Sequence, residues 1–238
     1  MIDRPIIGLL MDYQETGDFS SRPHYALRCS YFDAVWAAGG MPLALPYLGD
    51  AIDTFLDRCN GLILPGGFYP FPAAIYGDPP SSEEILHPRY VFERDLAASA
   101  LEQNVPTLGI CAGMQVMATI MGATLHRDVR KELPTEIDHL NKNPAEERAH
   151  SVSILTGTQL HKVLGSESLQ VNTAHKEALK HCPNGLTINA YAEDGVVEGI
   201  EIPGNQFYLG VQWHPEFFAN IGDANMNLFL ALVEASKT

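Results

Sequence analysis

The residues Gly109, Cys111 and Gly113 form a Gly-x-Cys-x-Gly pattern that could present a reactive thiol. This is the pattern of a nucleophile elbow, a sharp turn between a strand and a helix, with cysteine in place of serine. The glycines are required because a side chain at either position would collide with the neighbouring strand or helix. A sulfur at a helix N-terminus is favoured as a thiolate by free N–H groups and the helix dipole. The alternative is a structural cysteine, since free cysteines are often buried core residues.

His214 is the candidate for the base that such a thiol needs, chosen from nine histidines in the chain. It follows the apolar run 207–212, and Pro215 favours extended backbone in the residue before it. In an extended segment Glu216 points to the same side as His214. A carboxylate bonded to one ring nitrogen leaves the other nitrogen for the thiol. The alternative is a surface histidine that merely follows a strand.

A thiol, an imidazole and a carboxylate in this relation fit a cysteine hydrolase. The thiolate attacks a carbonyl, the imidazole moves the proton and the carboxylate orients the ring. The reaction also needs an oxyanion hole, for which the backbone N–H of Ala112 is the natural first donor. A backbone amide of Gly66 or Gly67, in a Pro-Gly-Gly turn after an apolar run, is the second. We expect no metal or organic cofactor, because the chain itself supplies every group.

The first half of the chain predicts the sheet that positions these groups. Apolar runs of strand length alternate with helical patterns, which indicates parallel strands joined by right-handed crossovers. The expected strands are 5–11, 41–45, 61–65 and 105–110, and the expected helices are 25–38, 51–58 and one that opens at Pro88. We therefore predict a three-layer, doubly wound, mostly parallel α/β fold of the flavodoxin-like type. Its ligands should bind at the carboxyl ends of the strands.

The second half predicts antiparallel additions to this sheet. Short strand-like runs at 150–155, 187–191, 196–202 and 207–212 are separated by turn signals, and a closing helix is expected at 225–235. The polar stretch 131–148 is expected to be a mobile loop, with a lid over the site as one role. The stretch 68–87 is expected to be an ordered, proline-rich loop. No repeat or linker is evident, so residues 1–238 are expected to form one domain.

Composition restricts the class of partner. The formal net charge is −14, from 29 acidic and 15 basic residues, which argues against nucleic acid and anionic membranes as partners. Four dispersed cysteines without a Cys-x-x-Cys pair indicate a reducing compartment. The apolar run at 6–11 is too short for a signal peptide or a membrane span. We therefore expect a cytoplasmic protein.

Three motifs together resemble those of class I glutamine amidotransferase-like hydrolases. They are Leu-Pro-Gly-Gly at 64–67, Gly-Ile-Cys-Ala-Gly-Met-Gln at 109–115 and Gly-Val-Gln-Trp-His-Pro-Glu at 210–216. The chain is most similar to the γ-glutamyl-γ-aminobutyrate hydrolase type, peptidase family C26. The similarity covers nearly the whole chain, including Val171-Asn172 with His175 and the stretch 194–198.

The resemblance implies an enzyme that cleaves γ-glutamyl amide bonds. The implied triad is Cys111, His214 and Glu216, the oxyanion hole is Gly67 and Ala112, and the substrate-binding residues are Gly66, Gln115, Asn172, Thr173 and His175. The reaction would pass through a glutamyl thioester and release glutamate and an amine, as in polyamine catabolism. The implied partner is a small γ-glutamyl molecule, and the resemblance is compatible with a homodimer.

The sequence also departs from the family pattern around the expected pocket mouth. Phe68-Tyr69-Pro70-Phe71, Ala112, Tyr90 and Lys176-Glu177 replace residues that are common in this branch, so the amine half of the substrate stays open. The first three aromatic side chains of this set, at 68, 69 and 71, predict a more apolar rim. Two other functions also stay open. One is a glutaminase subunit that supplies ammonia to a separate synthetase, and the other is a non-catalytic binding module on the same fold.

Overall fold

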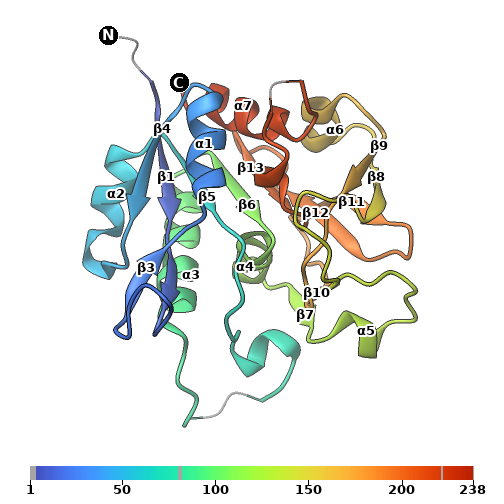
Figure 1. Ribbon diagram of the computed structural model, residues 1–238, viewed down its shortest axis with the longest axis horizontal. Helices are drawn as coiled ribbons and strands as arrows, with labels where there is room; N and C mark the ends of the chain where they lie inside the picture. Colours follow the sequence, from blue (N-terminus) through green and yellow to red (C-terminus); the bar gives the residue numbers. More distant parts are fainter. Residues whose placement is uncertain (1–3, 80–81, 221, 238) are drawn as a thin grey trace.

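A nine-stranded sheet organises the molecule, in the order β4-β1-β5-β6-β13-β12-β11-β8-β9 (Figure 1). A computed structural model describes residues 4–79, 82–220 and 222–237. The strands are β1 (Ile6–Leu10), β2 (Asp12–Gln14), β3 (His24–Ala26), β4 (Met41–Leu45), β5 (Gly61–Leu64), β6 (Thr107–Ile110), β7 (Thr124–His126), β8 (His150–Ile154), β9 (Ser168–Val171), β10 (Ala178–His181), β11 (Thr187–Ala192), β12 (Val197–Glu201) and β13 (Tyr208–Val211). The helices are α1 (Cys29–Ala37), α2 (Ile52–Arg58), α3 (Pro88–Glu102), α4 (Ala112–Ile120), α5 (Val129–Glu132), α6 (Gln159–Leu164) and α7 (Met226–Ala235), with 3-10 turns η1 (Gly49–Ala51), η2 (Ala73–Tyr76) and η3 (Pro215–Phe217).

The two halves of the sheet differ in strand direction, as the sequence predicts. Strands β4, β1, β5, β6 and β13 are mutually parallel, and β12, β11, β8 and β9 continue the sheet through antiparallel pairs. One part of the prediction is wrong. The run 207–212 is not only an antiparallel addition, because β13 also pairs in parallel with β6, with Val211 opposite Ile110. This pairing brings the end of β13 beside Cys111.

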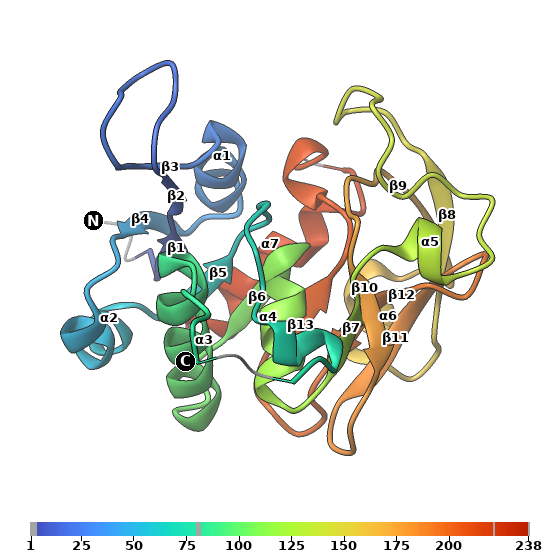
Figure 2. The same cartoon turned by 90° about the horizontal axis from the view of Figure 1, so that it is seen from below.

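Helices cover both faces of the sheet and give three layers (Figure 2). Helices α1, α6 and α7 pack on one face and α2, α3 and α4 on the other. Strand β1 serves both layers, because Ile7 and Leu9 belong to one apolar core and Leu10 to the other. Burial of both faces explains the continuous apolar runs of the central strands. None of the helices in the described part of the chain has the length and apolar composition needed to cross a membrane.

Several predicted boundaries shift for identifiable reasons. The predicted helix at 25–38 begins only at Cys29, because residues 24–26 pair with 12–14 as the β2–β3 hairpin. Pro88 opens α3 as predicted, and the loop before it contains η2; residues 80–81 of that loop lie outside the described residues. Strands β7, β9 and β10 and helix α6 were not predicted. They are short, so their patterns give little periodicity.

The polar stretch 131–148 is attached to the body of the protein through backbone groups. Its first residues belong to α5, and the rest is irregular. The carbonyl of His139 accepts hydrogen bonds from the His175 N–H at 2.8 Å and from the Thr173 hydroxyl at 2.9 Å. The carbonyl of Ala145 accepts one from Asn172 Nδ2 at 2.6 Å. Its role as a lid stays a prediction.

The glycines of the Gly-x-Cys-x-Gly turn are required by packing, as predicted. A Cβ at Gly109 would collide with Met114 and Met117 of α4, and a Cβ at Gly113 would collide with the backbone of Leu64 in β5. Helix α4 therefore begins in direct contact with two strands. The close approach fixes where the helix N-terminus lies relative to the sheet.

Replacing Gly113 by Ala should destabilise the protein by about 1–3 kcal/mol, because the new methyl group would force the Leu64 carbonyl away. The measurement is the free energy of unfolding in urea. The control is Gly49→Ala, since a Cβ at Gly49 meets no atom within 4 Å, and its effect should stay within about 0.5 kcal/mol. Equal effects of the two substitutions would contradict this explanation.

Candidate active site

Cys111 lies at the turn between β6 and α4 in a strained backbone conformation. Its φ of 52° and ψ of −109° are unusual for a residue with a side chain. Such strain persists only where the surrounding structure holds it, and it is frequent at functional sites. The strain places the Cys111 side chain, which is 4% exposed, directly before the first turn of α4.

His214 and Glu216 meet Cys111 from the segment after β13. The His214 ring hydrogen-bonds to Cys111, and its Nδ1 lies 2.8 Å from Glu216 Oε1. Glu216 reaches the ring by a route that differs from the prediction. The chain is not extended through these residues, because Pro215–Phe217 forms a 3-10 turn. The three predicted triad residues nevertheless lie together, and all three are buried.

The electrostatics of this group favour an ion pair between sulfur and imidazole. Burial alone lowers the pKa of His214, but the Glu216 carboxylate and Cys111 outweigh it and raise the pKa to about 10. Burial raises the pKa of the Cys111 thiol, but the charge and hydrogen bond of His214, the charge of His175 and the Ala112 amide together lower it. The arrangement therefore stabilises a thiolate beside an imidazolium at neutral pH.

Asn172 holds the backbone of His214. Its Oδ1 accepts a hydrogen bond from the His214 N–H at 2.9 Å, and its Nδ2 donates to the His214 carbonyl at 3.1 Å. The same Nδ2 donates to Ala145 in the 131–148 stretch. Both ends of the Asn172 amide thus have protein partners. Its observed contacts position the imidazole, whereas the resemblance implied that it binds substrate.

The buried Arg89 fixes the Pro65-Gly66-Gly67 turn opposite Cys111. Its guanidinium donates to the carbonyls of Pro65 and Gly66, the latter at 3.1 Å. It is held in turn by Glu93 at 2.8 Å and Asp12 at 2.9 Å. Burial alone lowers the pKa of Arg89, but the charge of Glu93 outweighs it and keeps the guanidinium ionised. Sequence reasoning gave Arg89 no role, although its position one turn before Glu93 is typical of an i,i+4 pair.

These bonds orient the two amides of the turn. In a trans peptide the C=O and the next N–H point in opposite directions. The Pro65 carbonyl faces Arg89, and the Gly66 N–H accordingly donates to the Tyr31 hydroxyl on the other side, at 3.0 Å. The Gly66 carbonyl also faces Arg89, so the Gly67 N–H points away from it. A Cβ at Gly66 would collide with the His214 ring, which shows how close this turn lies to the ring.

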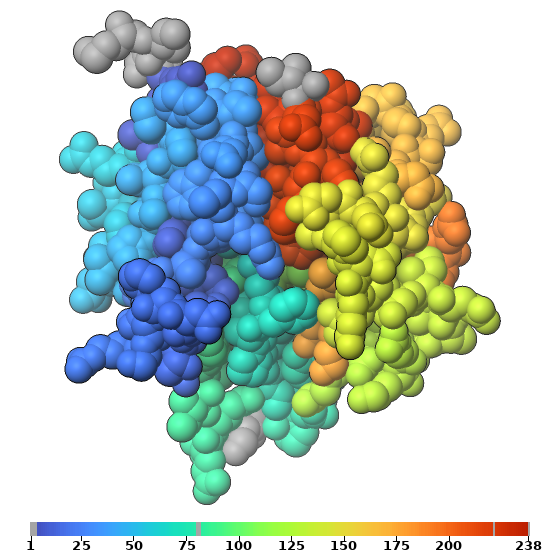
Figure 3. Space-filling model, in the orientation of Figure 1, coloured from blue at the N-terminus to red at the C-terminus, as the bar shows by residue number. Residues whose placement is uncertain are grey.

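Three cavities share Gly67 and Phe68 as wall residues, and one of them is lined by Cys111. One, of about 230 Å³, includes Cys111, Gln115 and the stretch 175–177. A second, of about 570 Å³, lies between the β2–β3 hairpin and Gly67. The third, of about 90 Å³, lies between His214 and residues 141–145. In Figure 3 the blue N-terminal segment, the teal loop after β5, the red segment after β13 and the yellow end of the 131–148 stretch surround this region.

The other predicted substrate-binding side chains also have protein partners. Gln115 Nε2 donates to the Glu177 carbonyl and to Gln212 Oε1, both at 3.0 Å. Thr173 donates to the His139 carbonyl, and His175 Nδ1 bonds to the Glu177 carbonyl at 2.9 Å. Gln115 and His175 still line the cavity beside the thiol. Their bonds hold residues 172–177 against α4 and β13.

The aromatic segment after Gly67 is less exposed than the sequence predicts. Phe68 is 66% exposed, but Tyr69 and Phe71 are buried. The Tyr69 hydroxyl donates to Glu93 at 2.7 Å, and its ring lies under the Arg89 guanidinium. Phe71 packs against Tyr90 edge to face. All four residues from Phe68 to Phe71 line the cavity beside Cys111, with Phe68 as its exposed aromatic member, and Tyr69 also supports Arg89.

The fold is that of the class I glutamine amidotransferase-like proteins. The glutaminase domain of Trypanosoma brucei CTPS, solved with bound acivicin, superposes with a TM-score of 0.63 over 98% of this chain and 93% of that one, at 20% identity. The sequence model of the Peptidase C26 family matches residues 5–216. The chain belongs to the Peptidase C26 family, which confirms the resemblance seen in the motifs.

Curated relatives are consistent with this membership. The glutamine amidotransferase-like protein RP404 of Rickettsia prowazekii is 32% identical, with all of this chain and 99% of the relative covered. The γ-glutamyl-γ-aminobutyrate hydrolase PuuD of Escherichia coli K12 is 27% identical, with 100% of this chain and 95% of the relative covered. The family and these relatives support hydrolase activity for this chain.

Cys111 should react with iodoacetamide at pH 7 as a thiolate, because its pKa is lowered. The rate should fall as the pH drops below that lowered pKa. His214→Gln removes the imidazolium, so the pKa should rise and labelling at pH 7 should slow by at least about tenfold. Mass spectrometry of each cysteine gives both rates. The exposed Cys29 is the internal control, and an unchanged rate at Cys111 would refute the ion pair.

Arg89→Met should destabilise the protein by about 3–5 kcal/mol, because Glu93 and two carbonyls would lose a buried cation. The measurement is the free energy of unfolding in denaturant. Arg94→Met on the same helix is the control. Arg94 pairs with Asp95 at the surface, so its loss should cost less than about 1 kcal/mol. A small effect at Arg89 would show that the turn is held by other contacts.

Proposed function

We propose that this protein hydrolyses γ-glutamyl amide bonds with a Cys111–His214–Glu216 triad. The observation that carries the proposal is the buried thiol bonded to an imidazole, which is itself bonded to a carboxylate at 2.8 Å. The strained turn at Cys111 and the lowered thiol pKa support the role of nucleophile. Membership of the Peptidase C26 family supports the reaction class.

The first half of the reaction forms a thioester. The Cys111 thiolate attacks the γ-carbonyl carbon, and the carbonyl oxygen becomes an oxyanion. The N–H groups of Ala112 and Gly67 are the proposed donors to this oxyanion. Support comes from the Ala112 amide, which points at the sulfur, and from the Gly67 amide, which points away from Arg89. Imidazolium His214 then donates its proton to the leaving nitrogen, the C–N bond breaks and the amine departs.

The second half regenerates the thiol. Neutral His214 accepts a proton from water, and the resulting hydroxide attacks the thioester carbon. The C–S bond breaks, glutamate is released, and the Cys111 thiolate is left beside the imidazolium that holds the proton from water. Glu216 stabilises the imidazolium in both halves. The chain supplies every catalytic group in this mechanism, and water is the second reactant.

The substrate is proposed to be a small γ-glutamylated amine. The cavity at Cys111 has room for a glutamyl group, and the larger cavity of about 570 Å³ next to Gly67 has room for the amine half. That second cavity is lined by Arg28 as well as by Asp12, which pairs with Arg89. The name of the relative PuuD supports γ-glutamyl-γ-aminobutyrate as the first substrate to test. The net charge of −14 disfavours a polyanionic substrate.

Cys111→Ala should lower the rate of glutamate release by at least about a thousandfold, because no other group can form the thioester. The assay measures glutamate released from a panel of γ-glutamyl amides with varied amine halves. Cys29→Ala is the matched control and should retain full activity, since Cys29 is exposed at the start of α1. Turnover by the Cys111→Ala variant at the parent rate would rule out the proposed nucleophile.

A glutaminase subunit is the second candidate, because RP404 is named as glutamine amidotransferase-like. The same triad would then hydrolyse glutamine and release ammonia for a separate synthetase. Parallel assays of the isolated chain on glutamine and on γ-glutamyl amines separate the two functions. Faster hydrolysis of glutamine than of γ-glutamyl amines would favour the function of a glutaminase subunit.

A further inference from the structure

A cluster of buried ionisable side chains lies beside the candidate active site and has no role in the triad. Its members are His139, His150, His175 and Glu198, each at most 6% exposed. They come from the 131–148 stretch, from β8, from the segment after β9 and from β12. The ring centroids of His139 and His175 lie 4.7 Å apart, and those of His139 and His150 lie 5.1 Å apart.

The inward-facing atoms of this cluster lack hydrogen-bond partners. His139 Nδ1, His150 Nε2, His175 Nε2 and both oxygens of Glu198 are buried without one. The three ring nitrogens lie 3.5, 3.6 and 3.4 Å from the same oxygen, Glu198 Oε1. A protein rarely leaves several buried polar atoms unsatisfied around one point. These contacts are within the range of ion pairs but are too long for direct hydrogen bonds, so the facing atoms remain able to bind a ligand between them.

The outward-facing nitrogen of each ring has an acceptor. His139 Nε2 lies 2.9 Å from Asp194 Oδ2, His175 Nδ1 lies 2.9 Å from the Glu177 carbonyl, and His150 Nδ1 lies 3.2 Å from the Ser151 carbonyl. A neutral imidazole that donates outward directs a lone pair inward. Histidines that bind metals show this arrangement, with the second nitrogen donating to a carboxylate or a backbone carbonyl. Burial lowers the pKa of His175 but Glu198 raises it overall, so an ion at this position displaces the His175 proton.

The distances distinguish an ion from a direct hydrogen bond or a water. Direct N–H···O bonds are shorter than those observed, at about 2.9 Å. A water bonded tetrahedrally to both partners would hold them about 4.6 Å apart, given bonds of about 2.8 Å. Ligands on a tetrahedral zinc ion, with bonds of about 2.1 Å, lie about 3.4 Å apart. The observed spacing to Glu198 is that of a metal site.

We propose that His139, His150 and Glu198 bind a divalent transition-metal ion, best matched by Zn²⁺, with His175 at the fourth position. Ligand atoms of the first three residues all lie within 4.8 Å of one another. Imidazole nitrogens with one carboxylate oxygen are a donor set that suits Zn²⁺. The proposal does not depend on the hydrolase reaction.

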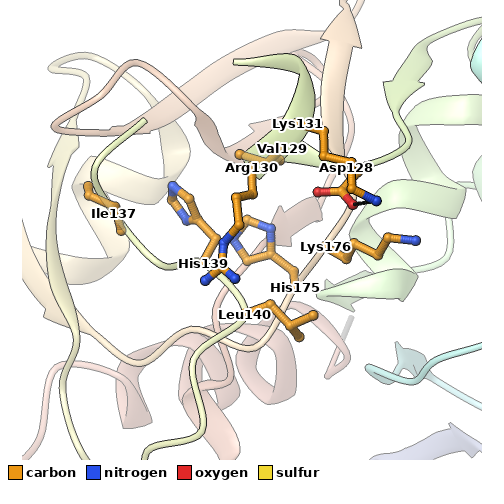
Figure 4. A pocket seen from close by; sticks show the side chains of 9 residues that line it. All are labelled: Asp128, Val129, Arg130, Lys131, Ile137, His139, Leu140, His175 and Lys176. Carbon is orange, nitrogen blue, oxygen red and sulfur yellow. Dashed lines mark ion pairs between the residues drawn. The ribbon is translucent and has the colours of Figure 1, made fainter. Parts of the chain in front are cut away.

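An entry path leads to this cluster from the surface. A cavity of about 190 Å³ is lined by α5 residues together with His139 and His175. Figure 4 shows the His139 and His175 side chains at the inner wall of this cavity and Arg130 extending over them. The Arg130 side chain is 67% exposed and pairs with Asp138, so it can move aside without disrupting the core.

The ion would attach the 131–148 stretch to the sheet. His139 is the only ligand from that stretch, and the others belong to the sheet and to the segment that carries Asn172. The stretch also bonds to Asn172 through Ala145, and Asn172 holds His214. The site is therefore structural, and it stabilises the wall of the cavity between His214 and residues 141–145.

The test is a titration of chelator-treated protein with Co²⁺ and then Zn²⁺. It is made in the Cys111→Ala variant so that the thiol contributes no ligand. One equivalent of Co²⁺ should give the absorption of a tetrahedral site, and Zn²⁺ should displace it. His139→Gln and Glu198→Gln should weaken binding by at least about tenfold. Asp194→Asn, which alters the hydrogen-bond partner of His139 and keeps every proposed ligand, should weaken it by about ten- to a hundredfold. His181→Gln, at an exposed histidine, is the control and should not change the affinity.

A second measurement does not require the ligand variants to fold. Zn²⁺ should raise the melting temperature of the Cys111→Ala protein and slow proteolysis within residues 131–148, because an ion that binds only the folded state stabilises it. Failure of this protein to bind one equivalent of either ion overturns the proposal. So does binding that His139→Gln and Glu198→Gln leave unchanged. Neither result bears on glutamate release, so this proposal and the proposed function fail independently.

Discussion

The contact of Arg89 with two consecutive carbonyls is the interaction on which the candidate site depends. A fully buried guanidinium needs acceptors on every side, and the Pro65 and Gly66 carbonyls supply two of them. Satisfying the cation therefore turns both peptide planes of the loop, one N–H toward Tyr31 and the next away from Arg89. Glu93, Asp12 and the Tyr69 ring hold the cation in place. The directions of the two loop N–H groups are thus set by Arg89 and Glu93, neither of which lines the cavity at Cys111.

A second support comes from the opposite side, through Asn172. This one amide bonds to both backbone groups of His214 and to the 131–148 stretch, so the imidazole and the outer wall of the cavity share an anchor. The histidine cluster is connected to the segment that carries Asn172, because Thr173 and His175 both donate hydrogen bonds to the His139 carbonyl. Three segments that are remote in sequence are therefore held together near the end of β13, where the parallel and antiparallel halves of the sheet meet.

The sequence predicts the fold class and the parallel strand runs, because these depend on local patterns of glycine, proline and apolar residues. It predicts the meeting of Cys111 with His214 and Glu216 from the chemistry that these residues would perform together and from the resemblance of their motifs to a known family. It does not predict the parallel pairing of β13 with β6, since strand direction in a sheet depends on partners distant in the chain. It also gives no sign of the roles of Arg89 and Asn172, because a buried hydrogen bond to a backbone carbonyl leaves no sequence pattern. The histidine cluster is equally hidden. His139, His150, His175 and Glu198 are spread over sixty positions and have no ligand spacing.

The fixed setting of His214 has a consequence for the order of events in the proposed reaction. Asn172 clamps the main chain of this residue on both sides, and Glu216 occupies one ring nitrogen, so the ring has a single free nitrogen and no second orientation. That nitrogen must serve first the departing amine and then the incoming water at the same spot. The two species cannot share it, and hydrolysis has to wait until the first product has vacated the space.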